Sequence, residues 1–241
     1  MIKGKKIVLF DMDGTLIDSV GIWNEVDCKL IAQIGQTQMQ GEEVQAGRDA
    51  ALRKFSTEPN PYLKYCGYLK EKYACSLTAE EILHQRYQIA DDYLTNEIDY
   101  KKDVEKVLRK LRDCGLKLII ATTTQKANMD IYRTKNRNIM GKAPLNEFFS
   151  IIYTREDVKE IKPNPEIYCK ILKELDVTPE DCIIFEDSLI GIEAANNAGI
   201  EVAVIYDKYS DHERSQINQR ANYYFEDYAA VLKAINEELH L

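Results

Sequence analysis

Two aspartates stand two positions apart directly after the first apolar segment of the sequence. Residues 7–10 are Ile-Val-Leu-Phe, and Asp11, Asp13, Gly14 and Thr15 follow them within five positions. Residues two apart in an extended chain point to the same side, so Asp11 and Asp13 can address one bound atom together. Such a pair can attack an electrophile and transfer protons. An ordinary strand followed by an Asp/Gly turn fits this stretch alone equally well, because both residue types favour turns.

Further polar side chains stand beside elements predicted later in the chain. They are Thr122 and Thr123 after a buried strand, Lys162 ahead of a helix, and Glu186 and Asp187 after another buried strand. In an open parallel sheet, ligands bind beyond the carboxyl ends of the strands. We therefore expect these groups to converge on Asp11 and Asp13.

The elements that must position these groups alternate between strand and helix over most of the chain. Strands are predicted at 7–10, 116–121, 149–153, 182–185, 201–205 and 222–225, and helices at 103–114, from about 126, at 165–175, at 189–198 and from about 227. Asp103 and Asn164 are predicted to cap two of these helices, with Pro165 in the first turn of the second. The polar segment 136–146, with Gly141 and Pro144, is predicted to be a loop. This alternation implies right-handed crossovers and a doubly wound, mostly parallel, Rossmann-like α/β sheet.

Residues 18–99 interrupt the alternation with helical patterns only. Predicted helices are an amphipathic one ending at Gly35, one at 42–55, one after Pro61 with tyrosines on its inner face, and one opened by a Thr78 capping box and running to about Asn96. The predicted domains are therefore an α/β core formed by 1–17 and 100–241, and an inserted all-α unit formed by 18–99.

Composition limits the kinds of partner. The 241 residues include 32 Lys and Arg against 40 Asp and Glu, a formal charge of −8, without a dense basic cluster, which argues against binding nucleic acid or an anionic membrane. Four apolar residues before Asp11 are too few for a signal peptide or a membrane span, so a cytoplasmic location is expected. The six cysteines form no Cys-x-x-Cys pair and are expected to be reduced. The oligomeric state, monomer or weak dimer, stays open.

The polar groups resemble motifs one to four of the haloacid dehalogenase superfamily, in the branch of β-phosphoglucomutase-like proteins and related phosphatases. The matching residues, in the same order as in the family, are Asp11-x-Asp13-Gly14-Thr15, Thr122, Lys162-Pro163-x-Pro165, and Glu186-Asp187-Ser188 with Gly191 and Ala194-Ala195. The resemblance spans essentially the whole chain and implies that the inserted helices are a cap over the site. It is specific for fold and phosphoryl chemistry, and less so for substrate.

The resemblance implies a role for each group. Asp11 would attack phosphorus and become an aspartyl-phosphate, while Asp13 would protonate the leaving oxygen and later deprotonate water. Thr122, Thr123 and Lys162 would hold the phosphate oxygens.

The resemblance also implies a cofactor, Mg²⁺, bound by Asp11, the Asp13 backbone carbonyl, Asp187 and water, with Glu186 either a further ligand or a supporting carboxylate. Acidic residues that merely favour a helix N-terminus are the ordinary alternative for Glu186 and Asp187. In the cap, Arg48 is either a substrate-binding residue or an exposed arginine at a helix start, and Arg86 is a weaker candidate of the same kind.

These observations predict a Mg²⁺-dependent phosphatase of small phosphorylated metabolites, such as a sugar phosphate. The alternative is a sugar-phosphate mutase of the β-phosphoglucomutase type. Related mutases carry a histidine where this chain has Trp23, and an indole cannot relay a proton or accept a hydrogen bond. Core packing on the first inserted helix is the commoner role of a lone tryptophan. A catalytically silent binding protein is a third possibility, against which the intact Asp11 and Asp13 pair argues.

Overall fold

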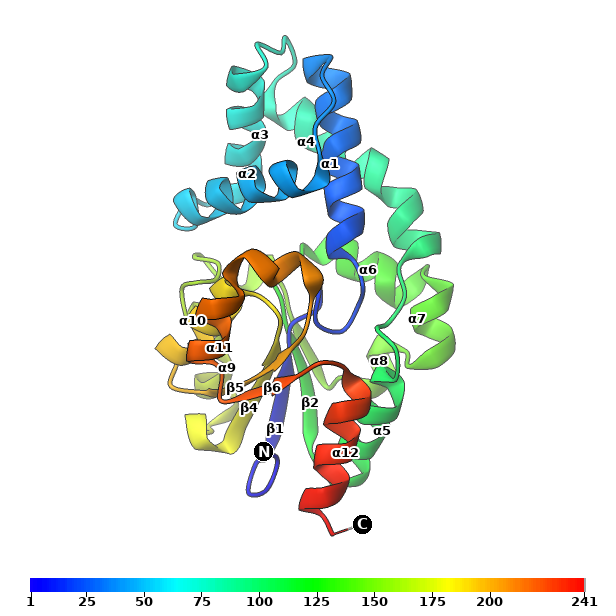
Figure 1. The fold of residues 1–241 in the computed structure, drawn as a ribbon, viewed down its shortest axis with the longest axis vertical. Helices are drawn as coiled ribbons and strands as arrows, with labels where there is room; N and C mark the ends of the chain where they lie inside the picture. The colour runs from blue at the N-terminus through cyan, green and yellow to red at the C-terminus, as the bar shows by residue number, and fades with distance from the viewer. Residues whose placement is uncertain (241) are drawn as a thin grey trace.

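Six parallel strands form one sheet at the centre of the computed structural model, which describes residues 1–240 (Figure 1). They are β1 (Ile7–Phe10), β2 (Lys117–Ala121), β3 (Ile151–Tyr153), β4 (Cys182–Glu186), β5 (Glu201–Ile205) and β6 (Tyr223–Phe225), in the order β3-β2-β1-β4-β5-β6. The parallel α/β sheet predicted from the sequence is thus confirmed.

Helices cover both faces of the sheet, which explains the continuous apolar segments of its central strands. Val8 and Phe10 belong to one core cluster, together with side chains of the helices on the right in Figure 1, whereas Ile7 and Leu9 belong to a second cluster with those on the left. The first set comprises α5 (Val104–Asp113), α6 (Lys126–Thr134), α7 (Arg137–Lys142), α8 (Leu145–Phe148) and α12 (Tyr228–Glu238), and the second comprises α9 (Glu166–Leu175), α10 (Leu189–Asn197) and α11 (Arg214–Arg220).

The strand order reverses at β1, and this reversal creates the position of the site. Phe10, the last residue of β1, pairs with Ile120 on one side and with Phe185 on the other. The chain after each of these strands therefore leaves the sheet at the same edge. Such a switch point is where doubly wound sheets bind ligands.

Helices α1 (Val20–Gly35), α2 (Gly41–Lys54), α3 (Pro61–Lys72) and α4 (Ala79–Asp92), with the π-helix η1 (Tyr93–Glu97), lie above this edge (Figure 1). Their two connections to the core pair with each other: the Asp18 amide donates to the Asp99 carbonyl at 3.2 Å and the Lys101 amide to the Leu16 carbonyl at 2.9 Å. This arrangement supports our proposal that residues 18–99 form a cap, and we use that word for them below.

Three local predictions were wrong. The predicted loop 136–146 contains α7 and α8, because Asn136 caps α7 by accepting from the Ile139 amide at 2.9 Å. Pro165 precedes α9 instead of lying in its first turn, and Asn164 accepts from the Glu166 amide at 2.9 Å. Asp103 occupies the N-cap position of α5 with φ +67° but makes no side-chain cap bond, and its carboxylate pairs with Lys106 at 2.5 Å.

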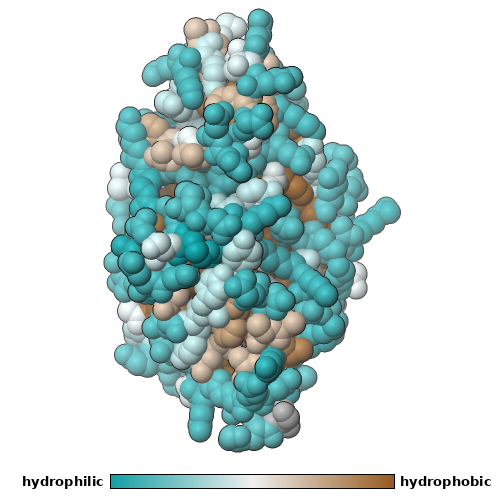
Figure 2. Space-filling view, viewed as in Figure 1, coloured by the Kyte–Doolittle hydropathy of each residue, from teal (hydrophilic) through white to brown (hydrophobic). Residues whose placement is uncertain are grey.

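Hydrophilic residues dominate the face drawn in Figure 2, with a smaller hydrophobic area toward its lower end. Among residues 1–240, the helices all fall short of the length and hydrophobicity that crossing a membrane requires. The six cysteines are free thiols, as the sequence predicts.

Candidate active site

The loop after β1 places Asp11 at the switch point and wraps around Asp187. Gly14 has φ +80°, and a Cβ there would lie 2.4 Å from Asp187 Oδ2, so only glycine fits. The Thr15 hydroxyl donates to Asp187 Oδ1 at 2.7 Å. The two acidic segments, 172 residues apart at Thr15 and Asp187, are therefore in direct contact.

Lys162 is buried between two carboxylates. Its ammonium donates to Asp11 Oδ1 at 2.6 Å, to Glu186 Oε1 at 2.7 Å and to the Ala121 carbonyl at 3.0 Å. Burial alone lowers the pKa of Lys162, but Asp11 and Glu186 outweigh it and hold that pKa well above its ordinary value. A permanent positive charge therefore stands beside Asp11.

Both carboxylate oxygens of Glu186 accept hydrogen bonds. Oε1 faces Lys162, while Oε2 accepts from the amides of Asp187 and Ser188 at 3.0 and 3.2 Å and from the Ser188 hydroxyl at 3.0 Å. A Cβ on Gly191 would lie 1.9 Å from Oε1, so this glycine gives the carboxylate its space. These bonds favour the supporting role for Glu186 over that of a metal ligand.

Asp11 and Asp187 fit a hard divalent cation. Burial raises the pKa of Asp11 to about 7, with Lys162 acting in the opposite direction, and burial and Glu186 also raise the pKa of Asp187. Within residues 1–240 no hydrogen-bond donor reaches Asp187 Oδ2. Two desolvated carboxylates, of which Asp187 makes no ion pair within the described residues, are the kind of oxygen ligand that Mg²⁺ prefers.

In the described residues, however, no three His, Cys, Asp or Glu side chains lie close enough together to hold a metal ion by themselves. Asp11 and Asp187 would thus need the Asp13 backbone carbonyl and water to complete a magnesium site.

Asp13 receives three hydrogen bonds that the sequence did not predict. Its Oδ1 accepts from the Ser19 hydroxyl at 2.5 Å and from the Trp23 indole N–H at 3.2 Å, and its Oδ2 accepts from the Thr124 hydroxyl. Trp23 is thus a hydrogen-bond donor to Asp13, a role that its position in the sequence does not reveal. The carboxylate is held by the core through Thr124 and by the cap through Trp23.

The three threonines after β2 lie in different environments. Thr122 is buried, and its hydroxyl donates to Thr124 Oγ1 at 2.9 Å while accepting from the Thr124 amide at 3.1 Å. Thr123 and Thr124 line the cavity in front of Asp11. The predicted phosphate-binding segment is therefore beside Asp11, with Thr123 rather than Thr122 facing the open space.

Arg48 and Arg86 meet inside the cap. Arg48 donates to Asp27 at 2.8 Å and to Asn24 at 2.9 Å, and Arg86 binds both oxygens of Asp27 at 2.6 and 3.2 Å. Burial alone would raise the pKa of Asp27, but Arg86 and Arg48 hold it below its ordinary value. Arg48 lies in the middle of α2 with 7% exposure, so the interpretation as an exposed arginine at a helix start is wrong.

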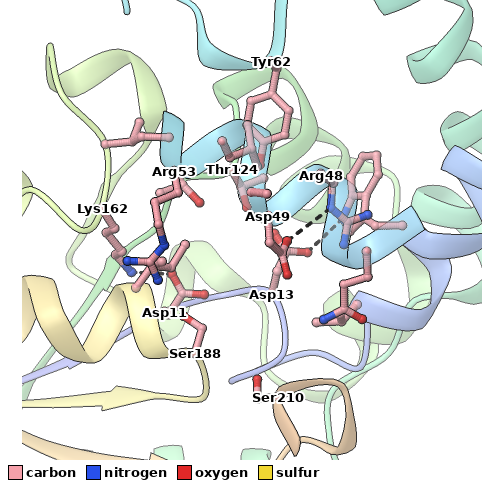
Figure 3. Close-up of a pocket in the computed structure, with 18 of the residues that line it drawn as sticks. Asp11, Asp13, Arg48, Asp49, Arg53, Tyr62, Thr124, Lys162, Ser188 and Ser210 are labelled. Carbon is pink, nitrogen blue, oxygen red and sulfur yellow. Dashed lines mark hydrogen bonds and ion pairs between the residues drawn. The ribbon is translucent and has the colours of Figure 1, made fainter. Parts of the chain in front are cut away.

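A cavity of about 420 Å³ separates the cap from the sheet edge (Figure 3). Its core side is lined by Asp11, Asp13, Thr123, Thr124 and Lys162, and its cap side by Trp23, Arg48, Asp49, Arg53, Tyr62, Arg86 and Tyr87. Glu186 also borders this cavity, so predicted site residues from five separate segments line one space, which is large enough for a small metabolite.

An aspartate beside a buried lysine, at the switch point of a doubly wound sheet and beneath an inserted helical unit, defines a Rossmann-like α/β enzyme. Residues 8–205 match the model of the haloacid dehalogenase-like hydrolases, and the chain belongs to this family. The superfamily predicted from the sequence is confirmed.

Relatives match over different shares of their length. YhcW of Bacillus subtilis is 28% identical over 235 residues, 96% of this chain and 93% of that protein. The phosphorylated carbohydrates phosphatase of Thermotoga maritima is 27% identical over 195 residues, 80% of this chain and 82% of that protein. The mitochondrial (DL)-glycerol-3-phosphatase 1 of Arabidopsis thaliana is 29% identical over 215 residues, which are 85% of this chain but 65% of that longer protein.

The fold recurs in solved structures. CbbY of Rhodobacter sphaeroides in complex with phosphate superimposes with a TM-score of 0.72 at 24% identity, over 93% of this chain and 95% of that one. A family IA hydrolase of Entamoeba histolytica gives a TM-score of 0.71 at 22% identity, over 93% and 94%.

Proposed function

We propose that the protein is a Mg²⁺-dependent phosphatase of small phosphorylated metabolites that works through an aspartyl-phosphate on Asp11. The observation that carries this proposal is the buried contact of 2.6 Å between Asp11 and Lys162 beside a cavity that Asp13 also lines. The phosphatase names of relatives such as the Thermotoga maritima protein support it.

The chain's own groups divide the reaction into two steps. Lys162 binds Oδ1 of Asp11, which leaves Oδ2 as the oxygen that attacks phosphorus. Asp13 gives a proton to the leaving oxygen, and in the second step it takes a proton from the water that attacks the aspartyl-phosphate. Lys162, Thr123 and Thr124 border the space for the phosphoryl oxygens and are suited to binding them.

Asp11, the Asp13 carbonyl and Asp187 would hold Mg²⁺, which supplies positive charge against the phosphoryl group. We expect excess chelator to abolish phosphate release and added Mg²⁺ to restore it. Ca²⁺ should inhibit, because it prefers more ligands at longer distances. Phosphate release measured across a metal series checks this, and full turnover in excess chelator would contradict the site.

A panel of phosphorylated sugars, nucleotides and short acids, with p-nitrophenyl phosphate as a general probe, tests the function. We expect free phosphate from p-nitrophenyl phosphate and from several sugar phosphates. Conversion of β-glucose 1-phosphate to glucose 6-phosphate with little free phosphate would instead establish a mutase. An absence of turnover with every compound would leave a binding protein on this fold.

The hydrogen bond from Trp23 to Asp13 gives a prediction about the acid. Trp23→Phe keeps a ring but removes the donor, so kcat/KM should fall by about tenfold for alkyl phosphates, the effect of losing one hydrogen bond to a charged group. The loss should be smaller for p-nitrophenyl phosphate, because its leaving group needs little protonation.

Tyr87→Phe is the matched control for this experiment. The Tyr87 ring packs edge-on against Trp23 at 6.4 Å, and its variant also removes one polar group from this corner of the cavity. Equal losses on both substrates in Trp23→Phe would show that Trp23 acts through packing alone.

A further inference from the structure

The arginines on the cap side of the cavity are all paired with carboxylates. Arg86 binds both oxygens of Asp27, and Arg48 binds the same carboxylate at 2.8 Å. Arg48 Nε also lies 3.7 Å from Asp49 Oδ1. The positive charge of this pair is therefore already compensated by two aspartates.

The third cavity arginine is compensated in the same way. Arg53 on α2 lies 3.0 Å from Glu193 on α10 and 3.7 Å from Glu213, both in the core. Three arginines thus stand against four carboxylates around this end of the cavity. A ligand that enters here meets no surplus of positive charge.

Asp49 is one of the two most exposed charged side chains on the cap side of the cavity, the other being Arg53 at 43% in its ion pair with Glu193. The Asp49 side chain is 44% exposed, whereas that of neighbouring Arg48, which also lines the cavity, is 8% exposed. The Asp49 carboxylate is therefore the more accessible of the two charges, whereas the Arg48 guanidinium is buried in hydrogen bonds to Asp27 and Asn24.

The uncharged residues around the cavity, from both cap and core, suit a neutral, hydroxylated group. Trp23, Tyr62 and Tyr87 supply ring surface, and Asn128 and Ser210 supply uncharged hydrogen-bonding groups. Ring surfaces with a few placed polar groups are the usual lining of small-molecule sites.

We propose that Asp49 makes the cavity selective for substrates with a single phosphate and a neutral, hydroxylated leaving group, and against bisphosphates. This inference rests on the proposed function, since it concerns the part of the substrate that does not react. A second phosphate at the cap side would lie beside the Asp49 carboxylate and would have to displace existing ion pairs, and repulsion of this kind is how sites reject a competitor.

Glucose 6-phosphate and glucose 1,6-bisphosphate form a matched pair of probes, with p-nitrophenyl phosphate as the measure of basal turnover. We expect kcat/KM for the monophosphate to exceed that for the bisphosphate by about tenfold or more. The bisphosphate should also compete weakly against p-nitrophenyl phosphate. A wild-type enzyme that turns over p-nitrophenyl phosphate but prefers the bisphosphate would overturn the inference and leave the proposed function standing.

Variants assign the selectivity to Asp49. Asp49→Asn should reduce the preference for the monophosphate by about tenfold, mainly by improving turnover of the bisphosphate, while Asp49→Glu should keep it. Asp91→Asn is the control, because Asp91 is an exposed aspartate of α4 that does not line the cavity. An unchanged preference in a folded Asp49→Asn enzyme, or the same change in Asp91→Asn, would overturn the role of Asp49.

Discussion

Asp11→Asn is expected to lower phosphate release by about four orders of magnitude or more, as loss of a catalytic nucleophile does in other enzymes. The amide has nearly the shape of the carboxylate but cannot attack phosphorus. Lys162 keeps its contact with Glu186 at 2.7 Å, so its charge stays paired and the fold should remain intact. Single-turnover phosphate release, with circular dichroism to confirm folding, measures the effect.

Two controls sharpen this experiment. Asp18→Asn makes the same chemical change at an exposed position in the first connection to the cap, and it should leave activity near that of the wild type. Mass spectrometry must exclude deamidation, which would restore Asp11 in a small fraction of molecules. Substantial activity in a verified Asp11→Asn protein would refute the aspartyl-phosphate mechanism.

Lys162→Met is expected to lower both the enzyme activity and the free energy of unfolding. The variant leaves Asp11 and Glu186 buried without a counter-ion, which typically costs about 3–5 kcal/mol of the free energy of unfolding. Activity should fall by about 10³-fold, because a group that binds transferred oxygens is lost. Urea unfolding monitored by circular dichroism and phosphate release measure the two effects.

The double variant Lys162→Met with Glu186→Gln separates the loss of stability from the loss of activity. It removes one of the two uncompensated charges, so part of the unfolding free energy should return, whereas activity should not. Recovery of activity in the double variant would mean that Lys162 acts only as a structural counter-ion.

Sequence reasoning could locate the core of the site because parallel strands end at one edge. Each predicted core residue follows a strand or precedes a helix, and the order β2-β1-β4 then brings Asp11, Thr122 and Glu186 together. The apolar segments that predict these strands are local features. Their convergence needs only the general topology of α/β folds.

The cap side could not be predicted in this way. Asp27 lies on a helix face that spacing alone assigns to an apolar core, and its partners Arg48 and Arg86 are 21 and 59 residues away. The contact of Trp23 with Asp13 depends on the direction in which α1 leaves the core. Asn136 likewise starts α7 inside a segment that composition marks as a loop, and its side chain also donates to the carbonyls of Leu94 and Ile98. Such contacts depend on how helices pack against one another, and the sequence of one segment alone does not determine that packing.

The paired connections at Leu16–Asp18 and Asp99–Lys101 hold the entry and exit of the proposed cap side by side. Because its entry and exit are hydrogen-bonded to each other, a helical segment of another length or shape could be joined at the same two points without moving β1 or its neighbours. The core groups around Asp11 and the cap side of the cavity can therefore vary separately in sequence. A replacement cap would still have to supply hydrogen-bond donors to Asp13, as Ser19 and Trp23 do here.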